Sequence, residues 1–127
     1  METINKINSF KDLIVWQKSI DLSGYVYILS NKFPREEVFG LTSQIRRASN
    51  SVSLNISEGS VKSTRTFINQ LSIARASASE VLSAAILANK IEFISIDGIE
   101  DLRPLIAEIT KMLNKLISSL EEKIKNS

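Results

Sequence analysis

The chain has 127 residues, of which 43% are hydrophobic and 24% charged, and it carries a formal net charge of +2. This length and balance fit one folded domain, and they exclude a disordered chain or two independent cores. Cysteine and histidine are absent, which excludes disulfides and thiolate metal sites and removes the commonest general base and metal ligand.

Residues 1–11 are interpreted as an N-terminal extension, followed by a helical domain over residues 12–123 and a short tail over 124–127. The extension has no uninterrupted apolar core of signal-peptide length, and no segment is predicted to span a membrane. The expected location is a bacterial cytoplasm.

The first predicted helix covers residues 12–32 and ends before Pro34, because proline disfavours helical conformation in the residue that precedes it. Its apolar residues form two stripes on opposite sides. One stripe contains Leu13, Trp16, Ile20 and Tyr27, and the other contains Val15, Leu22, Val26, Leu29 and Phe33. A monomeric four-helix bundle buries one side of each helix, so the second stripe is predicted to form an oligomer interface. The alternative is that Phe10, the loop over 33–40 or the tail covers it.

The second predicted helix covers residues 41–58, with Gly59 expected as a left-handed C-cap. It carries a row of polar side chains on neighbouring turns: Gln44, Arg47, Ser51, Asn55 and Glu58. Such a row predicts a hydrogen-bonded ladder that fixes helix register or subunit geometry. The alternative is a row that contacts phosphate or a partner chain.

The third predicted helix, over residues 62–90, has the most regular pattern. Apolar residues alternate spacings of four and three along it, which predicts a seam for another helix: Phe67, Leu71, Ala74, Ala78, Val81, Ala85 and Ala88. Glu80 is expected to pair with Arg46, Arg47 or Arg75, within or between subunits, rather than to act as an acid catalyst.

A connection over residues 91–95 leads to the fourth predicted helix, over 102–123, with Asp97 as its cap and Pro104 in its first turn. Large apolar residues recur along this helix and would face the alanines of the third. Four helices joined by short turns predict an all-α, antiparallel up-down-up-down four-helix bundle.

Charge is concentrated in the middle of the chain, where residues 38–79 contain five basic side chains and one acidic side chain. The basic residues are Arg46, Arg47, Lys62, Arg65 and Arg75. A solvated helix face explains such a bias without a partner, whereas a binding surface would attract a polyanion such as RNA or an acidic protein.

Several stretches in order along the chain resemble the four-helix-bundle family encoded in bacterial 23S rRNA intervening sequences. They are FKDL at 10–13, VWQK at 15–18, FP at 33–34, FGLTSQIRRA at 39–48, NISEG at 55–59 and IARAS at 73–77, together with Glu37, Ser51 and Glu80. Ala76 departs from the glycine often found in the family, and alanine suits a helix at least as well.

The resemblance implies a bundle that assembles as a ring-like homopentamer. It also implies a relation to the accessory proteins of diversity-generating retroelements, which are similar pentamers that bind a reverse transcriptase and nucleic acid. It implies no catalytic activity.

Enzyme classes built on helical bundles do not fit the sequence. Ribonucleases of the HEPN type need a histidine, and pyrophosphohydrolase bundles need paired acidic metal ligands, whereas Glu58 and Glu80 stand singly. No catalytic residue, metal site or cofactor is predicted.

The leading hypothesis is an oligomeric scaffold or adaptor, of which Arg46, Arg47, Lys62, Arg65 and Arg75 form a basic surface for RNA or a reverse-transcriptase-like protein. Contact with RNA would be driven by phosphates, because Trp16 and the tyrosines are assigned to packing. The alternative is a structural or protein-binding module without nucleic-acid contact.

Overall fold

Four long helices joined by short connections make up most of residues 10–127, the part of the chain that this computed structural model describes. The long helices are α2 (Ile14–Ser30), α3 (Leu41–Gly59), α4 (Thr64–Lys90) and α5 (Ile96–Lys125). Two single turns of 3₁₀ helix, η1 (Phe10–Asp12) and η2 (Arg35–Glu37), precede α2 and α3. Residues 1–9 of the expected N-terminal extension lie outside the described residues.

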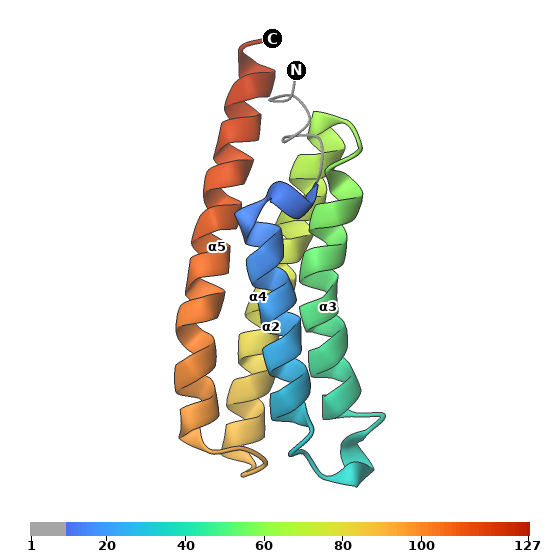
Figure 1. Cartoon of the computed structure of the whole chain (residues 1–127), viewed down its shortest axis with the longest axis vertical. Coiled ribbons are helices and arrows are strands. Elements are labelled where there is room, and N and C mark those ends of the chain that lie inside the picture. Colours follow the sequence, from blue (N-terminus) through green and yellow to red (C-terminus); the bar gives the residue numbers. More distant parts are fainter. Residues whose placement is uncertain (1–9) are drawn as a thin grey trace.

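Consecutive helices run in opposite directions. In Figure 1, α2 runs down the page, α3 returns upward, α4 runs down behind them and α5 runs up to the C-terminus. Each helix packs against the next, and α2 packs against α5. The predicted four-helix bundle is therefore confirmed. This order places the α2–α3 groove and the α4–α5 groove on opposite sides of the molecule.

The core is built from small residues on α4 and large residues on α5. Along α4 the alanines at 74, 78, 85 and 88 are fully buried, and so are Leu71 and Val81. Leu102, Ile109 and Leu113 of α5 are fully buried as well. The predicted seam along the third helix is confirmed, because alanine lets a neighbouring backbone approach closely while larger side chains fill the remaining space.

By length and composition, α4 also qualifies as a candidate membrane span. The core helix of a bundle has the same character, because one of its sides is lined with small apolar residues. Its buried side packs against α3 and α5.

The assignment of the stripe on the first helix to an oligomer interface is wrong. The side chains of that stripe are buried in the core of the chain itself: Val15, Leu22, Val26, Leu29 and Phe33. On the opposite stripe, Ile20 and Tyr27 are exposed, whereas Leu13 and Trp16 are half-buried against the core. Both sides of α2 are apolar, so periodicity alone cannot tell which side faces the core.

Polar contacts settle how α2 is rotated. The Tyr25 hydroxyl shares its proton between the Gly98 carbonyl oxygen and Asp101 Oδ2 of α5, at 3.2 and 3.3 Å. Burial, together with the Asp101 carboxylate, raises the pKa of Tyr25, so the phenol stays protonated and remains a donor. Lys18 Nζ reaches Glu108 Oε1 of α5 at 3.3 Å. With these groups beside α5, the Val15–Leu22–Leu29 side must point inward.

Several helix ends differ from the predictions, and the N-cap residue of α5 is Ser95 rather than Asp97. Gly59 has no positive φ and lies inside the last turn of α3, so it is not a left-handed cap. α5 begins at Ile96 rather than 102, which places Pro104 inside the helix instead of in its first turn. At its other end, α5 continues to Lys125 and takes in part of the expected tail.

Candidate functional site

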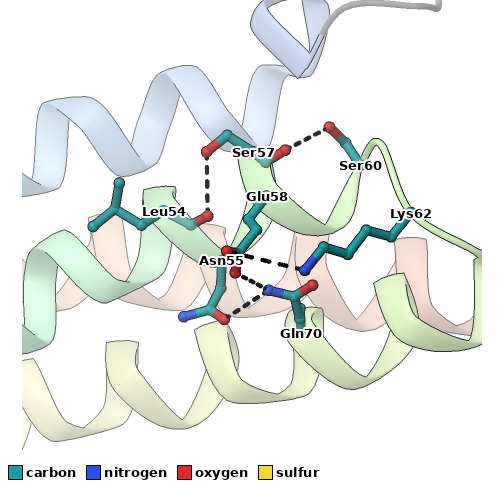
Figure 2. Close-up of polar contacts among 7 residues, drawn as sticks. All are labelled: Leu54, Asn55, Ser57, Glu58, Ser60, Lys62 and Gln70. Atoms are coloured by element: carbon teal, nitrogen blue, oxygen red, sulfur yellow. Dashed lines mark hydrogen bonds and ion pairs between the residues drawn. The ribbon is translucent and has the colours of Figure 1, made fainter.

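A chain of hydrogen bonds joins α3 to α4 along one side of the bundle. Ser77 Oγ donates to Ser51 Oγ at 2.9 Å, and Asn55 Nδ2 donates to the same Ser51 oxygen at 3.0 Å. Gln70 Nε2 donates to Asn55 Oδ1 at 3.3 Å and to Glu58 Oε1 at 2.6 Å. Figure 2 shows Gln70 of α4 pointing at Asn55 and Glu58 of α3. We call these five residues the polar ladder.

The polar ladder contains three of the five residues predicted for the row on α3: Ser51, Asn55 and Glu58. Arg47 bonds to Ser43 instead, and the exposed side chain of Gln44 makes no hydrogen bond with a described residue. Glu80 on α4 is also exposed and makes no hydrogen bond or ion pair with a described residue. The expected ion pair of Glu80 with an arginine is therefore absent among the described residues, and a pair between subunits stays a prediction.

The sequence patterns did not predict the two α4 residues of the polar ladder, Gln70 and Ser77. Gln70 and Ser77 lie seven residues apart, each one position before a seam residue. That spacing was a signal, because positions seven apart share a helix face. Gln70 is only 7% exposed, and its Oε1 atom is buried without a partner. A buried amide that is only partly satisfied constrains register more than it adds stability.

The five predicted basic residues do not form one surface. Arg46 and Arg47 lie early in α3, beside α2. Arg75 faces α5, where its Nη1 atom donates to Asn114 Oδ1 at 2.7 Å. Arg65 also faces α5, lining a hollow with Glu121 and Ile124. The prediction of a single basic surface is wrong, because the helix order puts these pairs on opposite sides.

Lys62 belongs to neither side. It lies in the connection between α3 and α4, where its Nζ atom is 4.0 Å from Glu58 Oε2. Figure 2 shows Lys62 reaching toward Glu58. This ion pair is solvent-exposed, so it contributes little to stability.

Arg46 is held rigidly at the corner between α2 and α3. Its Nε atom donates to Ser30 Oγ at 2.8 Å, and its Nη2 atom donates to Asn31 Oδ1 at 3.0 Å. Its guanidinium carbon lies 4.5 Å from the centroid of the Tyr27 ring. Three contacts, from Tyr27 and Ser30 of α2 and from its C-cap residue Asn31, therefore fix the guanidinium of Arg46 on α3, with Tyr27 as its stacking partner.

Tyr27 was predicted to serve in packing, but the structure does not place it in the core. Its side chain is 40% exposed, and its hydroxyl accepts a hydrogen bond from Asn50 Nδ2 at 3.0 Å. Arg47, the next residue of α3, is exposed. Its Nη2 atom makes one long hydrogen bond, of 3.4 Å, to Ser43 Oγ. The corner therefore brings together the aromatic ring of Tyr27, the fixed guanidinium of Arg46 and the weakly held guanidinium of Arg47.

Two adjoining hollows surround this corner. The larger, of about 570 Å³, is lined by Tyr27, Val38, Thr42, Ser43, Arg46, Arg47, Asn50, Ser51, Leu54 and Asn55. The smaller, of about 380 Å³, shares Val38, Thr42 and Arg46 with it and adds Arg35. Neither hollow has an acidic residue in its lining.

A third hollow lies on the opposite side, between α4 and α5, and the sequence patterns did not point to it. Its volume is about 780 Å³, its floor includes Leu82, Ile86 and Ile106, and Arg103 and Lys111 line it as well.

The described residues contain no group of three or more acidic side chains placed to hold a metal ion. What the arrangement offers chemically is anion binding, through guanidinium groups that stay charged at any physiological pH.

The sequence matches a family described as 23S rRNA-intervening sequence protein over residues 11–115. A similar solved structure is a protein with unknown function from the S23 ribosomal protein family of Bacteroides thetaiotaomicron VPI-5482. The two chains are 30% identical with a TM-score of 0.74, over 81% of this chain and 97% of that one. No curated protein matches the chain.

Proposed function

The chain belongs to the 23S rRNA-intervening sequence protein family, and from this premise we propose that it is a non-catalytic, cytoplasmic scaffold that assembles with copies of itself and binds RNA phosphates through arginine side chains. Neither the family nor the similar structure indicates an enzyme.

One observation carries the RNA part of the proposal. Arg46, Arg47, Arg65 and Arg75 have no described carboxylate within 4.0 Å, although the chain contains 14 acidic residues. A guanidinium cannot lose its charge, and its planar fork of donors matches phosphate oxygens. Four uncompensated arginines therefore favour a polyanionic partner.

Self-association is supported by the outer side of α4. Ile73 and Leu87, 14 residues apart on the same face, are 44% and 49% exposed, and Ile91 one turn further on is similarly exposed. Glu80 lies midway between Ile73 and Leu87 on this face and is exposed too, so the proposed interface consists of apolar side chains on both sides of a charged one. Exposed apolar side chains on the outside of a bundle favour contact with another subunit. This face replaces the α2 stripe as the proposed interface, and a ring such as a pentamer would repeat the arginines around the assembly.

The second candidate function is protein binding without RNA. The hollow between α4 and α5 favours it, because Leu82, Ile86 and Ile106 would receive the apolar side of a partner helix. Binding of that kind would depend only weakly on salt, whereas binding to phosphates depends on it steeply.

Salt dependence of RNA affinity tests the proposal. Fluorescence anisotropy with a labelled single-stranded RNA should give a log Kd that rises linearly with log salt, with a slope of roughly 0.7 per phosphate contact. Arg47→Gln and Arg65→Gln, one on each side, show which side is used, since removing a contact should lower the slope by about 0.7.

Lys90→Gln is the matched control, because Lys90 is exposed at the end of α4 and lines none of the four hollows described above. The control should leave affinity and slope unchanged. A folded protein that binds no RNA even at low salt would overturn the RNA proposal and leave the protein-binding one.

A further inference from the structure

We propose that the α2–α3 corner, defined by Tyr27, Arg46, Arg47 and Asn50, binds an unpaired nucleotide, with the base stacked on the Tyr27–Arg46 pair and the phosphate on Arg47. This inference rests on the proposed RNA-binding function and names what the site selects: single-stranded nucleic acid rather than duplex.

The stacking surface is formed before any ligand arrives. Arg46 is already hydrogen-bonded to Ser30 and Asn31 and lies over the Tyr27 ring, and the Tyr27 side chain is 40% exposed. The pair is therefore positioned before binding, and part of it stays accessible to a base. Bases stack on aromatic rings and on guanidinium planes alike. Little conformational entropy is lost on binding, because the side chains that receive the base are already ordered.

Asn50 supplies a contact for the edge of the base. Its Nδ2 atom is bonded to the Tyr27 hydroxyl, and its Oδ1 atom makes no hydrogen bond with a described residue. An amide oxygen beside a stacking ring can accept from the exocyclic amino group of a base. The amide is oriented by Tyr27, so the stacking and edge contacts come from one connected unit.

The charge and the size of the corner also fit a nucleotide. Arg47 is exposed and weakly held, so it is free to move onto a phosphate. The hollow of about 570 Å³ lies within the usual range for a small-ligand site. The adjoining hollow shares Arg46 and adds Arg35, which provides a cation for a neighbouring phosphate.

An unpaired nucleotide fits better than an acidic peptide or a duplex. Carboxylates of a peptide would use the arginines but leave the Tyr27 platform and the Asn50 oxygen unfilled. A duplex keeps its bases stacked on one another, so it could reach only the arginines.

The experiment compares Tyr27→Leu with Tyr27→Phe against a single-stranded RNA and a duplex of the same sequence. Tyr27→Leu removes the ring, so single-strand affinity should fall by about tenfold while the weaker duplex binding is unchanged. Tyr27→Phe keeps the ring and should bind within about twofold of the wild type. Circular dichroism establishes that each variant is folded.

Photo-crosslinking of the wild-type protein with a 4-thiouridine-labelled RNA is the second measurement, and it holds even if Tyr27→Leu fails to fold. The crosslinked peptide should contain Tyr27. Crosslinks confined to α4 or α5, or a folded Tyr27→Leu protein with undiminished single-strand affinity, would overturn the nucleotide site. RNA binding that remains salt-dependent in that case would preserve the phosphate proposal, whereas no RNA binding at all would overturn both.

Discussion

Gly59 and Gly24 both lie inside helices, but a methyl group would meet very different surroundings at the two positions. A Cβ atom on Gly59 would lie 2.9 Å from Phe67 Cδ1 and 3.2 Å from Gln70 Cβ, both on α4. A Cβ atom on Gly24 would meet nothing within 4 Å. The glycine expected to cap α3 is therefore needed for close approach of α3 to α4.

Alanine substitutions at these glycines should change stability in opposite directions. Gly59→Ala should lower the free energy of unfolding by about 1 kcal/mol or more, because crowding against α4 outweighs the better helix propensity. Gly24→Ala should raise it by about 0.5–1 kcal/mol. Urea unfolding followed by circular dichroism, at one protein concentration, measures both. Equal gains at the two sites would show that α3 and α4 are not packed this closely.

Gly59 was expected to be left-handed at the end of α3, but the left-handed residue follows α4. It is Glu92, where φ is 68°. There the Phe93 N–H donates to the Ala88 carbonyl oxygen at 2.8 Å, and the Glu92 N–H donates to that of Asn89 at 3.0 Å. These two bonds form a Schellman motif that ends α4. A glutamate pays a steric cost in this conformation that glycine does not.

Replacing Glu92 with glycine, Glu92→Gly, should therefore stabilise the protein by about 1 kcal/mol. The comparison variant is Ser60→Gly, at the end of α3, where φ is −63° and glycine brings no relief. That change should be neutral or cost up to about 1 kcal/mol. Thermal unfolding of the two variants measures the difference, and a lower melting temperature for Glu92→Gly would contradict the assigned cap.

Periodicity predicted all four helices, because each carries enough apolar residues at helical spacing to be recognised without its neighbours. It also located the α4 seam, where the alanines gather on one side. The rotation of α2 could not be predicted, since both its sides are apolar and the choice depends on Tyr25 meeting α5. In the polar ladder, Gln70 escaped notice because a buried glutamine and a solvated one look alike in a sequence. The Tyr27–Arg46 contact joins two helices, and helix-by-helix patterns cannot show it.

For the whole molecule, the proposed self-association predicts a native mass that is a multiple of the monomer. Ile73→Glu combined with Leu87→Glu should dissociate the assembly while helix content is retained, because charges on α4 would be buried at the interface. Light scattering gives the mass, and circular dichroism gives the helix content.

Ile28→Glu is the matched control, because Ile28 is exposed on α2 and lines a hollow with α5 and the α4–α5 connection rather than with α4 itself. It should leave the mass unchanged. A wild-type protein that is monomeric at micromolar concentration would refute self-association, and a double variant that keeps its full mass would refute the α4 interface.

The order of helices around the bundle also governs how the chain folds. Three of the four helix pairs join neighbours along the chain, so forming them closes only short loops and loses little chain entropy. The α2–α5 pair alone joins the two ends of the described chain, and its specific polar contacts are the long hydrogen bonds of Tyr25 and the Lys18–Glu108 ion pair. We therefore expect the α3–α4 hairpin, the most extensively packed of the three, to form first. The seam between the first and last long helices should close last and open first.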